Sequence, residues 1–270
     1  MNKTALYLSA SLLLLLALAG ALAPWLAPYP ESAQDIAARL QDSSASHWLG
    51  TDSLGRDLFS RIIFGARTSL AVGVVTAGFA LGIGTATGAW AGYRGGWIDL
   101  VLLRIVDFFS IFPSLLLAIL VTLILGKGLV GICLAIGLTS WMAQARLVRG
   151  LVLQARAQTY VEAAIAAGAR DTRVLFKQIL PNLWGPLLVN LSFQIPSNIL
   201  AESFLSFLGL GLQPPQSSWG TLANEGFRAM RSYPYLMIYP GIVLFACLAA
   251  FNVLSDALGE ARGIGPAYGR

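Results

Sequence analysis

Few side chains in this sequence have the type and spacing that catalysis or metal binding requires. The chain has one histidine, His47, and two cysteines, Cys133 and Cys247, which both lie inside apolar runs. These residues give neither a multi-histidine metal site nor a zinc-ligand or disulfide pattern. No Ser/His/Asp constellation is available, and no G-x-x-x-x-G-K-[ST] segment is present to bind nucleotide phosphates. We therefore expect no catalytic residue and no metal ligand, and we interpret His47 as an ordinary hydrogen-bonding residue.

Four ionisable residues lie in or near long apolar runs: Arg104, Asp107, Glu202 and Asp256. Ionisable side chains are costly in lipid, so they usually face the interior of a helix bundle or a partner. Arg104 and Asp107 are three residues apart, and on a helix this spacing lets them pair on one face. Glu202 either lines a pathway or contacts a partner, or it is a hydrogen-bonded acid that locks one helix to another. The serines that follow it favour the second interpretation.

The composition places the chain in a membrane rather than in water. Hydrophobic residues make up 56% of its 270 residues and charged residues only 11%, whereas soluble domains carry roughly a quarter charged residues. The net charge of +5 is modest, and no stripe of basic residues alternates with aromatic ones. Nucleic-acid binding is therefore not expected, and the lipid bilayer is the first partner that the sequence predicts.

Six apolar runs are long enough to cross a bilayer as helices. A hydrocarbon core about 30 Å thick needs about 20 helical residues, and only helices satisfy the backbone polar groups of such runs in lipid. The predicted spans are residues 5–23, 69–91, 100–125, 129–148, 187–210 and 236–258. The first run could instead be a signal peptide cleaved after Ala23. Its length and the single basic residue before it, Lys3, favour retention, so we predict an all-α integral membrane protein with six transmembrane helices.

The distribution of arginine and lysine predicts the orientation of these spans. The segment between the fourth and fifth spans is densely basic; it contains Arg146, Arg149, Arg156, Arg170, Arg173 and Lys177. The longer segment between the first and second spans contains only Arg39, Arg56, Arg61 and Arg67. Because basic loops tend to stay on the cytoplasmic side, the denser one is predicted to be cytoplasmic. With six spans, both termini then lie on that same side.

The spans divide the chain into three parts. Residues 1–68 hold the first span and an external segment, residues 69–258 form a core of five spans, and residues 259–270 form a short cytoplasmic tail.

Pro186 and Pro196 predict a kink or a broken start in the fifth span. The second span contains three small-xxx-small pairs, which serve either packing within the chain or a dimer contact; they are Gly78/Gly82, Gly84/Gly88 and Gly88/Gly92.

The segment 157–182 is the most polar connection between two spans. Residues 158–169 are rich in alanine, and Glu162 lies near their start, where an acidic side chain suits the helix dipole. Gly168 gives the backbone the freedom for a turn. We predict two short helices with a small-residue surface that another protein could approach closely, although the segment could also be a plain connector.

The second of these short helices is predicted to follow Gly168 directly. Asp171 or Thr172 would cap its first turn, and Pro181 would end it. Its apolar side would be formed by Val174, Leu175, Ile179 and Leu180.

This segment resembles the EAA loop of the permease subunits of bacterial ABC importers, which supplies the coupling helix that docks on the ATPase subunit. The resemblance is carried by Glu162, Ala163, Ala164, Gly168, Leu180 and Pro181. One position departs from the family pattern, because Gln178 stands two residues before Leu180, where the family often has an aliphatic residue. The resemblance implies an ATPase-docking loop, to which Ala167 and Arg170 also belong.

Three further segments are similar to the dipeptide, oligopeptide and nickel permeases of that family, and in particular to the second permease, which has a single leading span. The first is residues 47–57 (HWLGTDSLGRD) and the residues that follow up to Leu70. The second is Arg104 to Asp107, together with Phe112 and Pro113. The third is residues 202–211 (ESFLSFLGLG), together with Ser218 to Gly220. Together they cover nearly the whole chain after the first span.

The resemblance implies the binding-protein-dependent permease fold and the import of di- or oligopeptides by alternating access. The implied partners are a second permease subunit in a heterodimer, two ATPase subunits that hold ATP and Mg, and an external solute-binding protein that docks on residues 24–68 and 211–235. No cofactor is expected on this chain, and ATP hydrolysis is expected in the partner subunits. Arg104, Asp107, Glu202 and Pro196 are candidates for pathway or helix-packing roles.

Two alternatives stay open. Within the same family, the substrate could be nickel or a metal–chelator complex. From a different class, the chain could be a secondary transporter that works alone, although the sequence shows no persuasive internal repeat of the kind that such carriers often have.

Overall fold

The computed structural model describes residues 3–262, and in this range the secondary structure is helical apart from an isolated β-bridge between Thr51 and Asp57. The helices are α1 (Lys3–Ala21), α2 (Ala23–Leu26), η1 (Ile36–Ala38), α3 (Leu58–Arg94), α4 (Gly96–Ser110), α5 (Ser114–Leu125), α6 (Leu129–Arg156), α7 (Thr159–Ala166), α8 (Asp171–Val174), the π-helical η2 (Leu175–Ile179), α9 (Leu180–Phe207), α10 (Trp219–Ala229) and α11 (Tyr235–Ala261). Most of the predicted tail, 259–270, lies outside the described residues.

Four helices of the described chain are long and apolar enough to cross a membrane: α1, α3, α6 and α11. The predicted third span, residues 100–125, is not one straight helix. It is divided into α4 and α5, whose axes are bent by 87°. The break falls just before Pro113, which has no backbone N–H to continue the helical hydrogen bonds.

Helix α9 corresponds to the predicted fifth span and is 28 residues long, but it contains no 18-residue stretch as apolar as those in α1, α3, α6 and α11. Its polar side chains bond to neighbouring helices; Asn190 bonds to Gln144 of α6, and Asn198 bonds to Thr76 of α3. Pro186 and Pro196 lie inside α9, which continues through both, so the predicted broken start at these residues is wrong, whereas the alternative of a kink stays a prediction. The irregular turn is instead η2, directly before α9.

Helix α3 begins at Leu58, eleven residues before the predicted start of the second span. The Asp57 carboxylate accepts a hydrogen bond from the Ser60 backbone N–H at 2.8 Å, which is the arrangement of a helix N-cap. The segment from Ser60 to Leu70, whose resemblance to the permeases is described above, is therefore the first part of a long helix.

Helices α3 and α6 pack closely because glycines of α3 face the α6 backbone. An added Cβ at Gly84 would lie 2.6 Å from Gln144 Cβ, and one at Gly92 would lie 2.9 Å from the Arg149 carbonyl oxygen. Gly88, which lies between Gly84 and Gly92, also faces α6, at the Ala145 carbonyl oxygen. Packing within the chain is thus confirmed for these three glycines, whereas Gly78 and Gly82 face open space.

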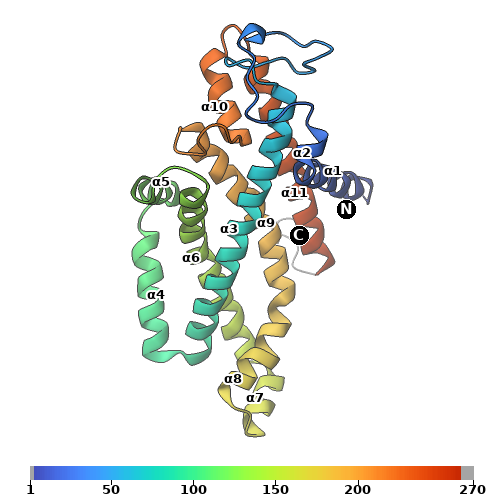
Figure 1. Cartoon of the computed structure of the whole chain (residues 1–270). Coiled ribbons are helices and arrows are strands. Elements are labelled where there is room, and N and C mark those ends of the chain that lie inside the picture. Colours follow the sequence, from blue (N-terminus) through green and yellow to red (C-terminus); the bar gives the residue numbers. More distant parts are fainter. Residues whose placement is uncertain (1–2, 263–270) are drawn as a thin grey trace.

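Helix α1 lies across the long helices rather than along them (Figure 1). Gly20 allows this close crossing, since a Cβ there would stand 2.8 Å from the Arg67 backbone nitrogen of α3. Leu13 and Leu16 pack on a buried cluster that includes Cys247 of α11. Most of the other α1 side chains are exposed.

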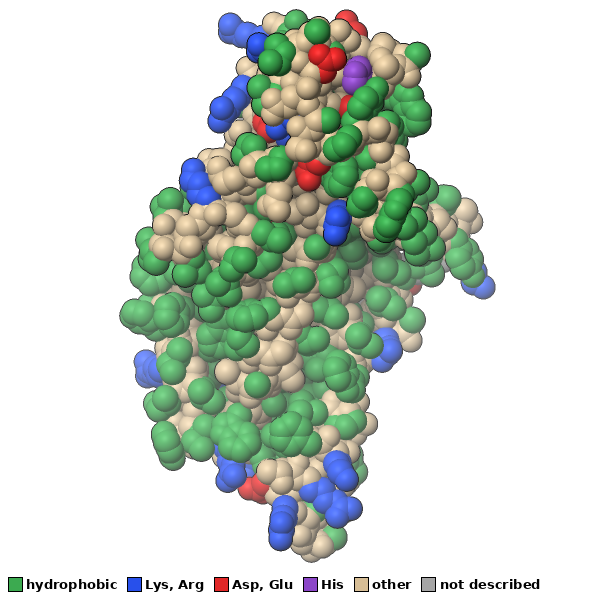
Figure 2. Space-filling view, viewed as in Figure 1, with side chains coloured by type: hydrophobic (Ala, Val, Ile, Leu, Met, Phe, Trp, Pro, Cys, Tyr) green, Lys and Arg blue, Asp and Glu red, His purple; other side chains and the backbone are tan. Residues whose placement is uncertain are grey.

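The molecule has two distinct ends. Figure 1 shows α7 and α8 at one end of the long helices, and α10 with the segment between α2 and α3 at the other. In Figure 2, hydrophobic side chains cover the middle. Lysines and arginines gather at the end that contains α7 and α8, whereas basic and acidic side chains are mixed at the opposite end. This arrangement separates the basic loop from the predicted external segments.

Candidate docking loop and buried polar groups

Helix α7 presents a surface of small side chains. Glu162, Ala163 and Ala167 are exposed, whereas Ala164 is partly buried and packs on the cluster beneath the loop. Glu162 lies in the first turn of the helix, where its negative charge is favoured by the helix dipole. The exposed alanines leave the backbone of α7 open to close approach by another molecule.

Gly168 forms the turn between α7 and α8. Its φ of +80° lies in the left-handed region, and nothing lies within 4 Å of the position that a Cβ would occupy. Glycine is therefore required here for its backbone conformation and not for lack of space. Arg170, directly before α8, is exposed beside this turn.

The second short helix differs from the prediction in two respects. Asp171 is the first residue of α8 and does not cap it; Arg170 stands at the cap position without a side-chain bond. Pro181 does not end a helix, because it lies in the first turn of α9, where a missing N–H costs little. The π-helical turn η2 joins α8 to α9, and the Leu180 N–H bonds to the Leu175 carbonyl.

A buried apolar cluster fixes both short helices to the long ones. Val161 of α7, Val174 of α8 and Ile179 of η2 are each fully buried in it. The same cluster contains residues of α3, α6 and α9; they are Ala89, Tyr93, Val148, Val152, Ala155, Leu183 and Leu187. The predicted apolar side of the second helix is thus buried, and the loop forms one packed unit with three long helices.

Polar contacts join the same elements at the surface. The Tyr93 hydroxyl of α3 donates to Asp171 Oδ1 at 3.1 Å, and Arg94 lies 3.4 Å from Asp171 Oδ2. Arg156, at the end of α6, donates to the Tyr93 carbonyl at 2.9 Å. These contacts connect α8 to the end of α3, and the end of α3 to the end of α6.

Glu202 is fully buried in α9 and accepts hydrogen bonds from serine hydroxyls. Ser206 donates at 2.7 Å and Ser69 of α3 at 3.1 Å, with Ser203 further away at 3.4 Å. The Ser69 oxygen also accepts from the Trp219 N–H of α10 at 3.3 Å. These contacts tie α3, α9 and α10 together, as the helix-locking interpretation of Glu202 requires. Pro196 is also buried in α9.

Arg104 and Asp107 do not pair with each other. Both are exposed on α4, and Asp107 bonds instead to Arg146 of α6 at 3.0 Å. The expected ion pair along one helix face is wrong, because α6 supplies a cation across the helix interface. A stronger pair, between Asp99 and Arg149, also joins α4 to α6, with two contacts of 2.6 Å. No local sequence pattern indicates this pair, since the partners are 50 residues apart.

At the opposite end, residues 47–61 form buried ionic contacts that sequence reasoning missed. Arg61 Nη1 lies 2.7 Å from Asp52 Oδ2 and 2.5 Å from Glu225 Oε2 of α10. Arg56 pairs with the same two carboxylates, at 2.6 and 2.8 Å. Alternating acids and arginines at 52, 56, 57 and 61 were the available signal. His47 Nδ1 bonds to Asp57 Oδ1 at 2.9 Å, which fits its interpretation as a hydrogen-bonding residue.

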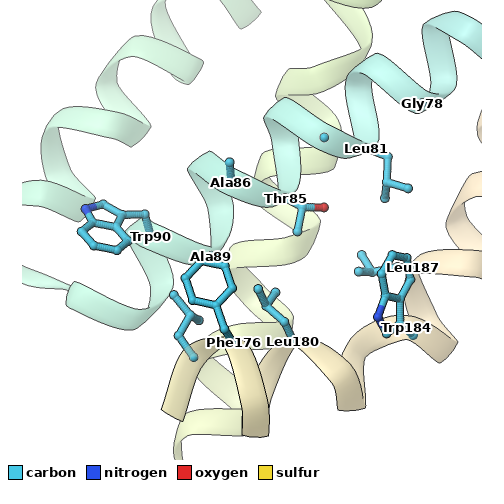
Figure 3. Close-up of a pocket in the computed structure, with 12 residues that line it drawn as sticks. Gly78, Leu81, Thr85, Ala86, Ala89, Trp90, Phe176, Leu180, Trp184 and Leu187 are labelled. Carbon is cyan, nitrogen blue, oxygen red and sulfur yellow. The ribbon is translucent and has the colours of Figure 1, made fainter. Parts of the chain in front are cut away.

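A cavity of about 640 Å³ lies between α3, η2 and the start of α9 (Figure 3). Gly78 and Gly82 form one side of it, and Phe176, Leu180 and Trp184 line the other. Its lining is almost wholly apolar. No group of three or more His, Cys, Asp or Glu residues within 3–262 is arranged to hold a metal ion.

Several long apolar helices, with a helical loop fixed to their ends, are typical of a multi-pass membrane protein. Residues 84–261 match the family described as binding-protein-dependent transport system inner membrane component, and the chain belongs to this family. The family resemblance of the sequence is thereby confirmed.

Several curated proteins are similar over most of their length. The oligopeptide transport system permease protein OppC of Bacillus subtilis is 41% identical over 250 residues, which are 93% of this chain and 82% of that protein. The dipeptide transport system permease protein DppC of the same organism is 41% identical, with 93% and 78% covered. The glutathione transport system permease protein GsiD of Escherichia coli O157:H7 is 40% identical, with 94% and 84% covered.

A solved structure confirms the predicted fold class. A chain of the MetNI methionine ABC transporter, in inward-facing conformations, matches with a TM-score of 0.59 and 18% identity, covering 76% of this chain and 96% of that one. At this identity the likeness shows the fold alone.

Proposed function

We propose that this chain is one of two permease subunits in an ATP-driven importer that moves di- and oligopeptides across the cytoplasmic membrane of a bacterium. The observation that carries the proposal is the exposed surface of α7, which is joined to α3, α6 and α9 through one buried cluster. The relatives named for oligopeptide, dipeptide and glutathione transport support a peptide substrate.

The proposed mechanism is alternating access driven from outside the chain. Two partner ATPase subunits bind ATP and Mg, and their closure pushes on α7, Gly168 and α8. The Tyr93–Asp171 contact and the cluster around Val174 pass this displacement to the long helices. The second permease subunit completes the pathway, and the chain itself catalyses no reaction.

The proposed orientation puts the α7–α8 loop and both termini in the cytoplasm. The concentration of basic side chains at that end supports it (Figure 2). A solute-binding protein would then dock at the opposite end, on residues 24–57 and on the 211–235 segment that contains α10.

Crosslinking tests the docking surface. In a chain with Cys133 and Cys247 replaced by alanine, Ala167→Cys is expected to crosslink to the ATPase through a thiol-to-amine reagent, because Ala167 is exposed beside the turn. Ala45→Cys, which is exposed at the opposite end, is the matched control and should not crosslink. An assembled, active complex in which both variants behave alike would refute docking at α7.

Uptake measurements test whether transport is coupled to the ATPase and whether the chain is instead a secondary transporter. Glu162→Lys places a positive charge in the first turn of α7 and should abolish ATP-driven uptake while membrane insertion stays normal. The purified chain alone in liposomes should transport nothing. Uptake driven by an ion gradient without any ATPase would instead favour a secondary transporter.

A further inference from the structure

A second cavity, of about 250 Å³, lies between α5, α6 and α9 and differs in chemistry from the large apolar one. No charged side chain lines it, and its polar residues are Ser114, Thr139, Ser140, Gln194, Ser197 and Asn198. Thr139 and Ser140 lie eleven and twelve residues into α6, and Gln194 to Asn198 lie near the middle of α9. Polar residues at such depth are costly in lipid and usually face the bundle interior or a passage.

Asn198 organises this cavity. It is almost fully buried, and its Nδ2 donates to Thr76 Oγ1 of α3 at 2.8 Å. Its Oδ1 accepts from Ser140 Oγ at 3.0 Å and from Gln194 Nε2 at 3.1 Å. Asn198 therefore has partners on three helices and acts as a positioning residue, which holds Ser140 and Gln194 at the cavity wall.

The remaining hydrogen-bonding capacity of the wall is mainly that of acceptors. The Ser197 hydroxyl donates to the Phe193 carbonyl at 2.9 Å, and the Thr139 hydroxyl donates to the carbonyl of Ile136 at 3.0 Å. Each hydroxyl oxygen then keeps lone pairs free, and so does the Oε1 of Gln194, which accepts no hydrogen bond from residues 3–262. The Ser114 hydroxyl and the second N–H of Gln194 can still donate, but the uncharged acceptor oxygens of Thr139, Gln194 and Ser197 are complementary to N–H donors.

We infer that this cavity binds N–H groups of the peptide during its passage, through the oxygens of Thr139, Gln194 and Ser197. Because no charged residue lines the cavity, the contact does not select among charged side chains of the peptide. The N–H donors come either from the main-chain amides or from the terminal ammonium group. This inference rests on the proposed function and adds the site that the substrate touches.

The experiment uses the complete importer in proteoliposomes, with ATP and a saturating solute-binding protein, and compares the uptake of a labelled tripeptide. Ser197→Ala and Thr139→Val each remove one acceptor and should lower uptake about two- to tenfold, as expected for one hydrogen bond. The matched control is Ser192→Ala in the same helix, whose hydroxyl bonds to Val189 and does not line the cavity. It should leave uptake unchanged, and ATP hydrolysis should persist in all three variants.

Two modified peptides identify the donor. For each peptide, the ratio of variant to wild-type uptake is measured, so that weaker capture by the binding protein cancels. If the ratio returns to one with a peptide that is N-methylated on its main chain, the site is supported and its ligand is a main-chain amide. If the ratio returns to one with an N-acetylated peptide, the site is supported and its ligand is the terminal ammonium group. A ratio that stays low with both peptides overturns the inference.

The inference and the proposed function fail in different ways. If the wild-type complex takes up peptide but Ser197→Ala and Thr139→Val match it, the inference alone is wrong. If the wild-type complex takes up no peptide, the proposed substrate is wrong and the inference falls with it.

Discussion

The hydroxyl of Tyr93, in the last turn of α3, donates a hydrogen bond of 3.1 Å to Asp171 Oδ1, at the first residue of α8. This bond crosses from a membrane-crossing helix to the loop proposed to dock on the ATPase. It lies at the edge of the buried cluster that also contains Val161 and Val174. The loop is thus attached to α3 by an apolar contact and by a directional one.

Tyr93→Phe is expected to reduce the peptide uptake per ATP hydrolysed about two- to tenfold. The substitution removes one hydrogen bond, worth about 1 kcal/mol, but keeps the ring in the cluster. Asp171→Ala should give a similar loss, and the double variant should be no worse than either single one. The measurement is uptake and ATP hydrolysis in the same proteoliposomes.

Arg94 provides the control for this prediction. It also approaches Asp171, at 3.4 Å, but both side chains are about half exposed, so solvent screens the pair. Arg94→Gln should leave the coupling ratio nearly unchanged. An equal effect of Arg94→Gln and Tyr93→Phe would mean that charge, and not the directional bond, transmits the motion.

The ionic contacts at the opposite end predict strong coupling between Arg61 and Glu225. Arg61 is buried, and Arg61→Met leaves Asp52 and Glu225 without one of their cations, at a cost of about 3–5 kcal/mol. The Glu225 side chain is 31% exposed, so Glu225→Gln should cost less. The double variant should be less destabilised than the sum of the two changes. Thermal unfolding of the four proteins in detergent checks this, and additive losses would contradict it.

Local rules were sufficient for the loop but not for the ionic contacts. Alanine content predicted α7, and Gly168 predicted the turn, because both effects act within a few residues. The partners of Asp107 and Arg61 depend on which helices pack together, and Arg61 and Glu225 are 164 residues apart. Pro181 was misread for a related reason, since a proline ends one helix or begins another according to the turn before it.

Two neighbouring glycines of α3 should respond in opposite ways to the same change. Gly84→Ala would press a Cβ to 2.6 Å from Gln144 Cβ and should destabilise the chain by about 1–3 kcal/mol. Gly82→Ala meets nothing within 4 Å and should stabilise α3 by up to about 1 kcal/mol, since alanine is the better helix former. Melting temperatures of the two purified variants, compared with wild type, test the placement of the α3–α6 interface.

Two substitutions of Glu202 distinguish a role in holding helices together from a role in the transport pathway. Glu202→Ala leaves the hydroxyls of Ser69 and Ser206 without their acceptor and opens a cavity, so a loss of about 3 kcal/mol or more is expected. Glu202→Gln keeps the shape and one acceptor oxygen, and a serine hydroxyl can rotate to accept from the new amide. Its loss should be near 1 kcal/mol. If Glu202 only locks helices, uptake by the glutamine variant stays near the wild-type level at temperatures well below its unfolding transition. A glutamine variant that is stable and assembled but takes up little peptide would show that the carboxyl group itself acts in transport.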